Sequence, residues 1–191
     1  MSVVSVDVEL HFNTQKSSQV DGLRRFAYQK SGLFYNAKSK EDILKSGSLT
    51  LGIHQRHGNG LFAGRGILIG YWAYAKRYGK EIIEVRKGDI LLIRSGFTDK
   101  YIELSEDQER ESAHMTPPKA CGMAQDERML HFLWEKEVAK VGGDAPAWEC
   151  LPPDPSSSFL DHEVLLVGWG CPIGELLWLE QLARACGDHK K

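Results

Sequence analysis

The apolar residues of this chain fall in short blocks separated by polar and glycine-containing segments. Residues 3–12 alternate between apolar and polar side chains, which predicts a strand. Continuous aliphatic runs at residues 67–69, 90–93 and 164–167 predict buried strands, because a strand covered on both faces is apolar at every position. We therefore expect a sheet whose strands are drawn from the whole chain.

Helical signals lie between these runs. Ser39 and Asp42 have the spacing of a capping box. Residues 126–140 have an amphipathic pattern that runs up to a pair of glycines, as at a helix C-terminus. Further helices are expected over residues 71–78, after Ser105, and over residues 175–186. Interleaved helices and strands are typical of an α/β fold in a single domain, residues 1–191.

The composition is that of an ordinary globular protein. The 191 residues are 42% hydrophobic and carry a formal net charge of -2, so no global field attracts nucleic acid or an anionic membrane. No apolar run reaches the roughly 18 residues that a membrane helix needs. Asp7 and Glu9 stand where a secretory signal would be apolar, and the 4 cysteines are widely spaced, as in reduced proteins. We expect a cytoplasmic protein.

A polar segment and two later residues suggest chemistry. Residues 13–25 are polar and turn-like, and such stretches inside compact domains are often functional. This segment carries Asp21, while His162 and Glu175 flank the predicted last strand. Carboxylate, imidazole and carboxylate can together bind a divalent metal or transfer protons. Equally, His162 could belong to a turn that starts a strand, and Glu175 could complement a helix dipole.

Several separated blocks resemble one known family, in the same order. They are FNTQKSSQVDGLRRFAYQK, GLFAGRGILIGYWAYA, KGDILLIRSGFTDKY, VGGDAPAWE and HEVLLVGWGCPIGELLWLEQLA. The chain is similar to the cyclase family that includes bacterial kynurenine formamidase and isatin hydrolase, above all to its fungal branch. The resemblance implies a swivelling β/β/α domain with a mixed sheet and flanking helices. It also implies hydrolysis of amides or cyclic amides by a metal-bound water.

The hallmark of that family is H-x-G-T-H-x-D-x-P-x-H, joined by a later His and Glu. The resemblance places the hallmark aspartate on Asp21 and the later pair on His162 and Glu175. It therefore implies that these residues hold Zn or Mn. The two histidines before the aspartate fall on Gln15 and Gln19, so part of the ligand set is missing.

The last histidine of the hallmark falls on Arg25. A guanidinium has no lone pair to donate and brings a fixed positive charge into the ligand shell. We therefore expect little or no tightly bound metal. We also expect Asp21, Arg25, His162 and Glu175 to converge in one cleft as the catalytic residues, whichever chemistry they perform.

The chain is short beside the fungal relatives. We expect it to lack a leading segment, part of the region between Ala75 and Val85, and the closing strands beyond Gly187. An unpaired apolar sheet edge invites pairing with another chain. We therefore expect a homodimer that acts on a small-molecule substrate.

Three functions remain open at this point, of which the first is the leading hypothesis. It is a metal-dependent hydrolase of the arylformamidase type, acting on an amide C–N bond or a cyclic small molecule. The second is a metal-independent cyclase, isomerase or dehydratase of secondary metabolism, in which Arg25 takes the place of the cation. The third is a non-catalytic shortened homologue that serves as a binding or regulatory subunit.

Residues 142–146, with the sequence GGDAP, predict a structural turn that leaves a buried strand close to the site. Asp144 lies within this turn. Its carboxylate could contribute to chemistry, but capping the turn is the favoured interpretation.

Overall fold

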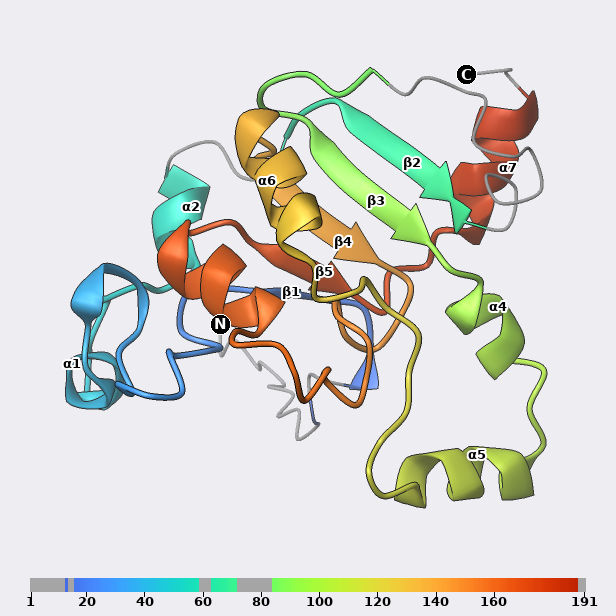
Figure 1. Ribbon diagram of the computed structural model, residues 1–191, viewed down its shortest axis with the longest axis horizontal. Coiled ribbons are helices and arrows are strands. Elements are labelled where there is room, and N and C mark those ends of the chain that lie inside the picture. The colour runs from blue at the N-terminus through green and yellow to red at the C-terminus, as the bar shows by residue number, and fades with distance from the viewer. Residues whose placement is uncertain (1–12, 14–15, 59–62, 72–83, 189–191) are drawn as a thin grey trace, which may run out of the picture.

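Five strands form one mixed sheet in the computed structural model, which describes residues 13, 16–58, 63–71 and 84–188 (Figure 1). Their order across the sheet is β1-β5-β4-β3-β2. β1 is antiparallel to β5, and all other neighbours are parallel. The fold is therefore of the expected mixed α/β class. The strands are β1 (Gln19–Asp21), β2 (Gly66–Gly70), β3 (Ile90–Arg94), β4 (Lys140–Gly143) and β5 (Ile173–Glu175).

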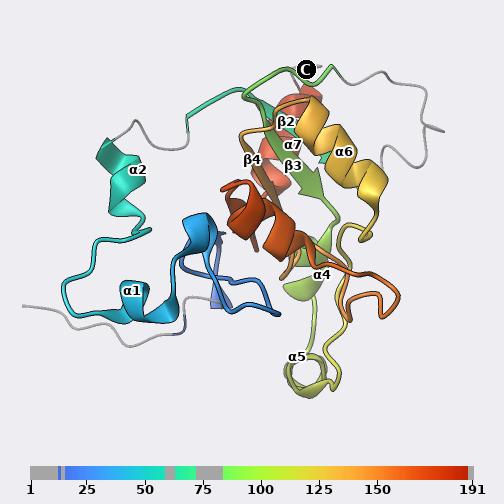
Figure 2. The ribbon, with the colours of Figure 1, turned by 60° about the vertical axis from the view of Figure 1, so that its left-hand side comes forward.

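Helices flank this sheet. In both ribbon views the segment with α1 and α2 lies to one side of the sheet, and α5 stands apart beyond α4 (Figure 1, Figure 2). None of the helices in the described part of the chain is long and apolar enough to cross a membrane. The helices are η2 (Tyr35–Ala37), α1 (Lys40–Leu44), α2 (His54–Gly58), α4 (Phe97–Tyr101), α5 (Glu106–His114), α6 (Glu127–Glu135), η3 (Glu163–Gly168) and α7 (Glu180–Asp188).

Several local predictions are confirmed. The Ser39 hydroxyl accepts the Asp42 N–H, and the Asp42 carboxylate accepts the Ser39 N–H, which completes the capping box of α1. Ser105 caps α5 in the same way. The aliphatic runs at 67–69 and 90–93 form β2 and β3. The strand expected over residues 3–12, and nearly all of the helix expected over 71–78, lie outside the described residues.

One face of the sheet builds the core. The register aligns Leu91 of β3, Val141 of β4 and Ile173 of β5, and all three are buried. Because side chains alternate between the two faces of a sheet, this row points to one side. There it joins Leu133 of α6 and Leu165 of η3 in a single hydrophobic cluster.

The opposite face is packed through glycine. The next row aligns Gly142 of β4 with Gly174 of β5. A Cβ at Gly142 would lie 2.9 Å from Leu177 Cδ1, and one at Gly174 would lie 3.0 Å from the same atom. Glycine at both positions therefore lets Leu177 pack directly on the backbone of the sheet.

Residues 163–168 form the π-helix η3 and not the buried strand that their apolar pattern predicted. Leu165, Leu166 and Val167 are all buried. The Trp169 N–H bonds to the Val164 carbonyl, five residues back, which closes the wide turn. A short continuous apolar run fits a buried strand and a buried helix equally, so the pattern alone could not separate them.

The end of α6 also differs from the prediction. The helix stops at Glu135, well before the glycines at 142 and 143, which lie inside β4. Glu137 takes a left-handed conformation with φ 48°. The Val138 N–H then bonds back to the Leu133 carbonyl, so the helix closes without glycine.

The last helix begins later than predicted. Glu175 belongs to β5, and α7 starts at Glu180. The helix also continues past Gly187 to Asp188. The interpretation of Glu175 as a residue of a first helical turn is therefore wrong.

Asp144 is a structural residue of the turn after β4. Its side chain is fully buried, and its carboxylate accepts hydrogen bonds from the Ser95 N–H, the Ser95 hydroxyl and the Gly96 N–H. Ser95 and Gly96 connect β3 to α4, and Gly96 has a positive φ of 89°. The carboxylate thus ties the ends of two neighbouring parallel strands together, as the turn-capping interpretation expects.

Replacing Asp144 with Asn should lower the free energy of unfolding by about 1.5–3 kcal/mol, the scale of a hydrogen bond to a charged group. The new side-chain NH₂ group is itself a donor and would face groups of Ser95 and Gly96 that also donate. Urea unfolding measures the change. Asp107→Asn is the control, because that side chain is 95% exposed, and it should change stability by less than about 0.5 kcal/mol. Unchanged stability of Asp144→Asn together with lost activity would contradict the structural role.

Candidate functional site

The pairing of β1 with β5 brings the polar candidates to one face of the sheet. Gln19 lies opposite Glu175, and Asp21 lies opposite Ile173. Residues two apart on a strand share a face, and directly paired residues point to the same side. Gln19, Asp21 and Glu175 therefore face the same side as Ile173, toward the core cluster. Asp21 lies at the end of a strand and not in the polar loop that the sequence predicted.

His162 reaches the same place from the start of η3. Its Nε2 lies 3.2 Å from Glu175 Oε1 and 3.7 Å from Asp21 Oδ2. One ligand atom of each of the three residues lies within 4.8 Å of the other two, and all three side chains are buried. Asp21 and Glu175, which are 141 and 13 positions from His162 in the sequence, thus meet it in one group. His162 begins a helix, so the interpretation of a strand start is wrong.

Glu149 and Trp148 complete the surroundings, and neither was predicted from the sequence. His162 Nδ1 lies 2.6 Å from Glu149 Oε2, on the ring edge opposite the other carboxylates. The Trp148 N–H donates to Glu175 Oε1 at 3.1 Å. Both residues stand in the block VGGDAPAWE that carries part of the family resemblance, so the block itself was the available signal.

The carboxylates strongly favour the charged form of His162. Burial lowers the pKa of His162, but its contacts with Asp21, Glu149 and Glu175 outweigh burial and raise the pKa to about 11. In the absence of a metal, His162 is therefore an imidazolium at neutral pH. This positive charge offsets part of the negative charge of the group.

A further buried acid adjoins His162. Burial, reinforced by the Glu149 carboxylate, raises the pKa of Asp161 to about 7. Neither of its carboxyl oxygens has a hydrogen-bond partner among the described residues. Asp161 is thus partly protonated at neutral pH, so it carries less negative charge than an ordinary aspartate.

Arg25 lies beside the buried group, next to Asp21. Its Nε is 3.5 Å from Asp21 Oδ2, and its side chain is 45% exposed. The structure therefore brings Asp21, Arg25, His162 and Glu175 together. Gln19, onto which the resemblance places a hallmark histidine, donates from Nε2 to Glu175 Oε2 at 3.0 Å. Gln15 lies outside the described residues.

The donor set fits a divalent metal ion. It consists of two carboxylates and an imidazole, which are ordinary ligands of Zn²⁺ and of Mn²⁺. The buried Asp21 Oδ2 accepts no hydrogen bond among the described residues, as expected for an atom that a cation would contact. The group is small, however, and Arg25 places a positive charge beside it.

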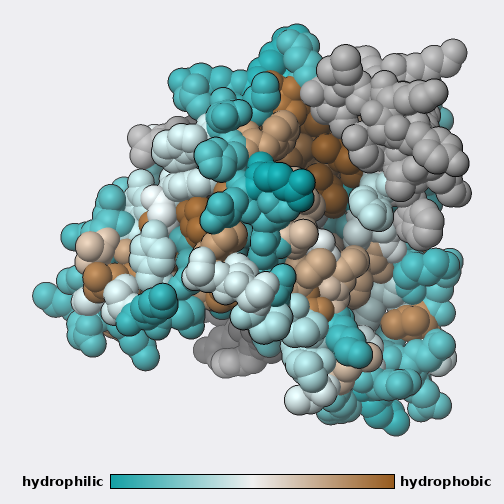
Figure 3. Space-filling model, in the orientation of Figure 1, coloured by the Kyte–Doolittle hydropathy of each residue, from teal (hydrophilic) through white to brown (hydrophobic). Residues whose placement is uncertain are grey.

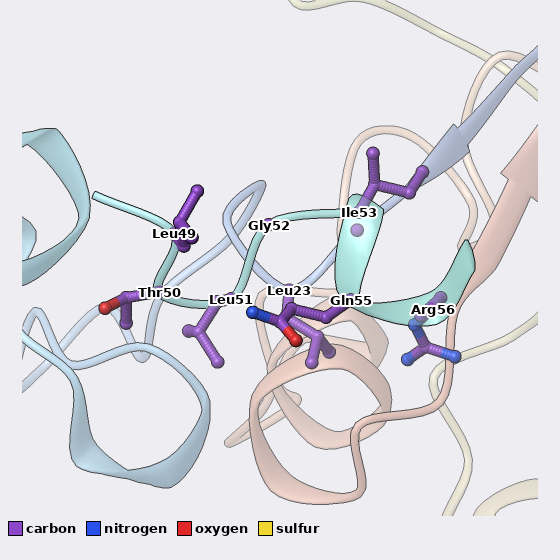
Figure 4. Close-up of a pocket in the computed structure, with 9 residues that line it drawn as sticks. Leu23, Leu49, Thr50, Leu51, Gly52, Ile53, Gln55 and Arg56 are labelled. Carbon is purple, nitrogen blue, oxygen red and sulfur yellow. The ribbon is translucent and has the colours of Figure 1, made fainter. Parts of the chain in front are cut away.

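The site opens toward the segment before α2. A hollow of about 520 Å³ is lined by Asp21 and Arg25 together with Gly52, Ile53 and His54. A second hollow of about 390 Å³ shares Gly22, Leu51, Gly52 and Ile53 with the first. Figure 4 shows its remaining labelled residues on the loop leading into α2, on α2 itself and on the chain after β1: Leu23, Leu49, Thr50, Gln55 and Arg56.

An apolar pocket of about 420 Å³ lies at the carboxyl ends of β3 and β4. Its lining includes Ile93, Gly143 and Trp148. Trp148 links this pocket to the site, because its backbone N–H holds Glu175. Open sheets with parallel strands commonly bind ligands at this edge.

Comparisons with known proteins give a match among solved structures. No protein-family model matches the sequence, and no curated protein matches it. A solved structure described as the crystal structure of a novel cyclase matches with a TM-score of 0.73 and 27% sequence identity. The chain is similar to a cyclase. The match covers 95% of this chain but 62% of the cyclase, so the chain spans less than two thirds of that protein's length. The likeness supports the cyclase family.

Metal affinity should increase with pH. Nε2 of His162 must lose its proton to bind a metal, and the pKa of that group is raised to about 11. The apparent affinity for Zn²⁺ should therefore rise by about tenfold per pH unit below that value. Competition with a chromophoric chelator from about pH 6.5 to 8.5 measures the slope. The control variant His114→Gln, at the exposed end of α5, should show the same slope of Zn²⁺ affinity against pH. A flat profile would contradict binding through His162.

Histidines at the two described positions onto which the resemblance places hallmark histidines should strengthen metal binding. The double variant Gln19→His and Arg25→His adds imidazoles beside the ligands and removes a fixed positive charge. Zn²⁺ affinity should rise by at least about tenfold, since a unit charge at 4 Å is worth on the order of 1–4 kcal/mol between water and a protein surface. Isothermal titration measures it.

The single variant Arg25→Gln separates the two effects, because it removes the charge without adding a ligand. It should give a smaller increase than the double variant. Equal Zn²⁺ affinity of the wild type and the double variant would show that these positions do not adjoin the metal.

Proposed function

We propose that this chain is a metal-dependent hydrolase of the cyclase family that cleaves an amide C–N bond or opens a cyclic amide. The observation that carries the proposal is the buried group Asp21, His162 and Glu175, whose ligand atoms lie within 4.8 Å of one another. The proposal includes the finer assignments expected from the resemblance: the kynurenine formamidase-like branch, its fungal subgroup and the swivelling β/β/α subtype.

Each residue of the group has a defined task. Asp21, His162 and Glu175 would hold Zn²⁺ or Mn²⁺, which when bound supplies a Lewis acid and an acidified water. Trp148 and Gln19 each donate to one oxygen of Glu175, and so fix the plane of its carboxylate. Burial of the group excludes bulk water and strengthens its electrostatic interactions.

Arg25 is suited to orienting the substrate. Its guanidinium is partly exposed and is held beside the site by Asp21. It can donate hydrogen bonds to a carbonyl oxygen and stabilise the negative charge that develops there when the carbonyl is attacked. The hollow lined by Asp21 and Arg25 gives a small molecule access. The pocket beside Trp148 offers room for an apolar part of the substrate.

The electrostatics also favour a second candidate, a metal-independent cyclase, isomerase or dehydratase. Burial lowers the pKa of His162, but its carboxylate contacts outweigh burial and raise the pKa to about 11. An imidazolium therefore already stands among the carboxylates. Arg25 adds a second positive charge at the rim. In this candidate His162 and Glu175, which are 3.2 Å apart, exchange protons with the substrate.

The experiment assays hydrolysis of an N-aryl formamide and a cyclic amide by the purified protein, before and after chelation and after addition of Zn²⁺ or Mn²⁺. We expect activity that chelation removes and metal restores. His162→Gln should lower kcat/KM by at least about 100-fold, the scale of losing a group that acts in the reaction. His131→Gln, on α6, is the control and should keep full activity.

Activity that chelation leaves unchanged and His162→Gln abolishes would favour the metal-independent candidate. No hydrolysis of either substrate with any added metal would contradict the metal-dependent hydrolase and leave the metal-independent and non-catalytic candidates standing.

Self-association, expected from the resemblance, stays a prediction. Within the described residues β2 pairs with β3 alone and so forms one edge of the sheet. Ile67 and Ile69 of β2 are only partly buried, and Figure 3 shows apolar surface where β2 and β3 run. We propose that this edge takes part in a homodimer.

A further inference from the structure

The two ring nitrogens of His162 face different partners. Nδ1 lies 2.6 Å from Glu149 Oε2, whereas Nε2 faces Asp21 and Glu175. Both His162 and Glu149 are buried. The Nδ1 contact is the shortest that the ring makes. Glu149 does not belong to the group whose atoms could hold a metal, because it lies on the other edge of the ring.

This geometry selects one tautomer. An ionised carboxylate only accepts hydrogen bonds, so the nitrogen that faces Glu149 must carry the proton. When the ring loses one proton, Nε2 is therefore the nitrogen that becomes a lone-pair donor. That lone pair points toward the two carboxylates on the opposite edge. The reverse tautomer would set an Nδ1 lone pair against a carboxylate oxygen at 2.6 Å, which is less favourable than an Nε2 lone pair facing carboxylate oxygens at 3.2 and 3.7 Å.

The segment that carries Glu149 is held firmly in place. The Met123 N–H donates to the Trp148 carbonyl, and the Cys150 N–H donates to the Met123 carbonyl, so hydrogen bonds flank Glu149 on both sides. Gly122 lies so close that a Cβ on it would be 2.4 Å from the Glu149 carbonyl carbon. Because no side chain larger than hydrogen fits there, the segment around Gly122 packs against the Glu149 backbone itself.

We infer that Glu149 is a positioning residue for His162: it keeps the proton on Nδ1 and turns the Nε2 lone pair toward Asp21 and Glu175. Carboxylates behind metal-binding histidines have this effect in metalloproteins, and their loss typically weakens metal binding by about 10- to 100-fold. The inference rests on the proposed function for its metal-binding consequence. The hydrogen bond and the tautomer do not depend on a metal.

The first test is made on the metal-free wild-type protein labelled with ¹⁵N-histidine. NMR should show a His162 Nδ1–H proton that is far downfield and exchanges slowly with water, as a short hydrogen bond to a buried carboxylate requires. Comparison with the spectrum of His162→Gln assigns the signal. Absence of the signal in the wild type would overturn the inference without any Glu149 variant being needed.

The second test compares the Zn²⁺ affinity of the wild type with that of Glu149→Gln, Glu149→Asp and Glu180→Gln. Glu149→Gln keeps the shape of the side chain but loses the charge, and it should bind Zn²⁺ about 10- to 100-fold more weakly. It should also shift or lose the Nδ1–H signal. Glu149→Asp keeps a carboxylate, so it should recover part of the Zn²⁺ affinity and part of the Nδ1–H signal.

Glu180 is the matched control, since it is equally buried and is paired with a cation, Arg94 at the end of β3. Glu180→Gln should lower stability but leave the Zn²⁺ affinity and the His162 signal unchanged. Equal loss of affinity in the Glu149 and Glu180 variants would show a merely structural effect and overturn the inference. Unchanged affinity and an unchanged signal in Glu149→Gln would also overturn it.

The two tests separate this inference from the proposed function. If the wild type binds no metal and hydrolyses no amide, the proposed metal-dependent function fails, and the Nδ1–H signal still decides the role of Glu149. If the wild type binds Zn²⁺ and turns over substrate while Glu149→Gln does the same with an unchanged signal, the proposed function stands and the inference fails.

Discussion

The arrangement of the site depends on one imidazole held between carboxylates. Glu149 contacts one ring edge of His162 at 2.6 Å, and Glu175 and Asp21 approach the other edge. Three buried carboxylates around one ring would be costly without a compensating positive charge, because like charges repel strongly in a low-dielectric interior. A positive charge at the centre resolves this conflict, whether a proton on His162 or a metal ion supplies it. The metal and the proton therefore compete for the same place.

The fold supplies the rigidity that this arrangement needs. Gln19, Asp21 and Glu175 are fixed by the pairing of β1 with β5, in which a shift by one residue would turn each of them to the opposite face. His162 is fixed by η3, whose Leu165, Leu166 and Val167 are buried in the core. The same hydrophobic burial that stabilises the domain thus positions the polar group.

Much of this could be predicted from the sequence, and the failures have physical reasons. β2, β3 and two capped helices follow from local patterns, because aliphatic runs and capping residues act over a few positions. The meeting of Asp21, His162 and Glu175 followed from the resemblance, since no local signal links residues so far apart. Glu149 was missed for a related reason. Nothing in the local sequence AWEC, residues 147–150, marks a glutamate that will face a histidine ring. That contact depends on the backbone hydrogen bonds of Met123 with Trp148 and Cys150, and on the close approach of Gly122 to Glu149.

The π-helical turn of η3 ties the spacing of the site to the core. A π-turn corresponds to one extra residue in an α-helix. Removing one residue between His162 and Trp169 would restore the narrower turn and rotate everything before it by about 100°. His162 would then leave the carboxylates, or the buried leucines would leave the core. Insertions and deletions in this short segment are therefore coupled to function in a way that those in the exposed connections around α5 are not, and relatives that keep the site must keep the length of this segment.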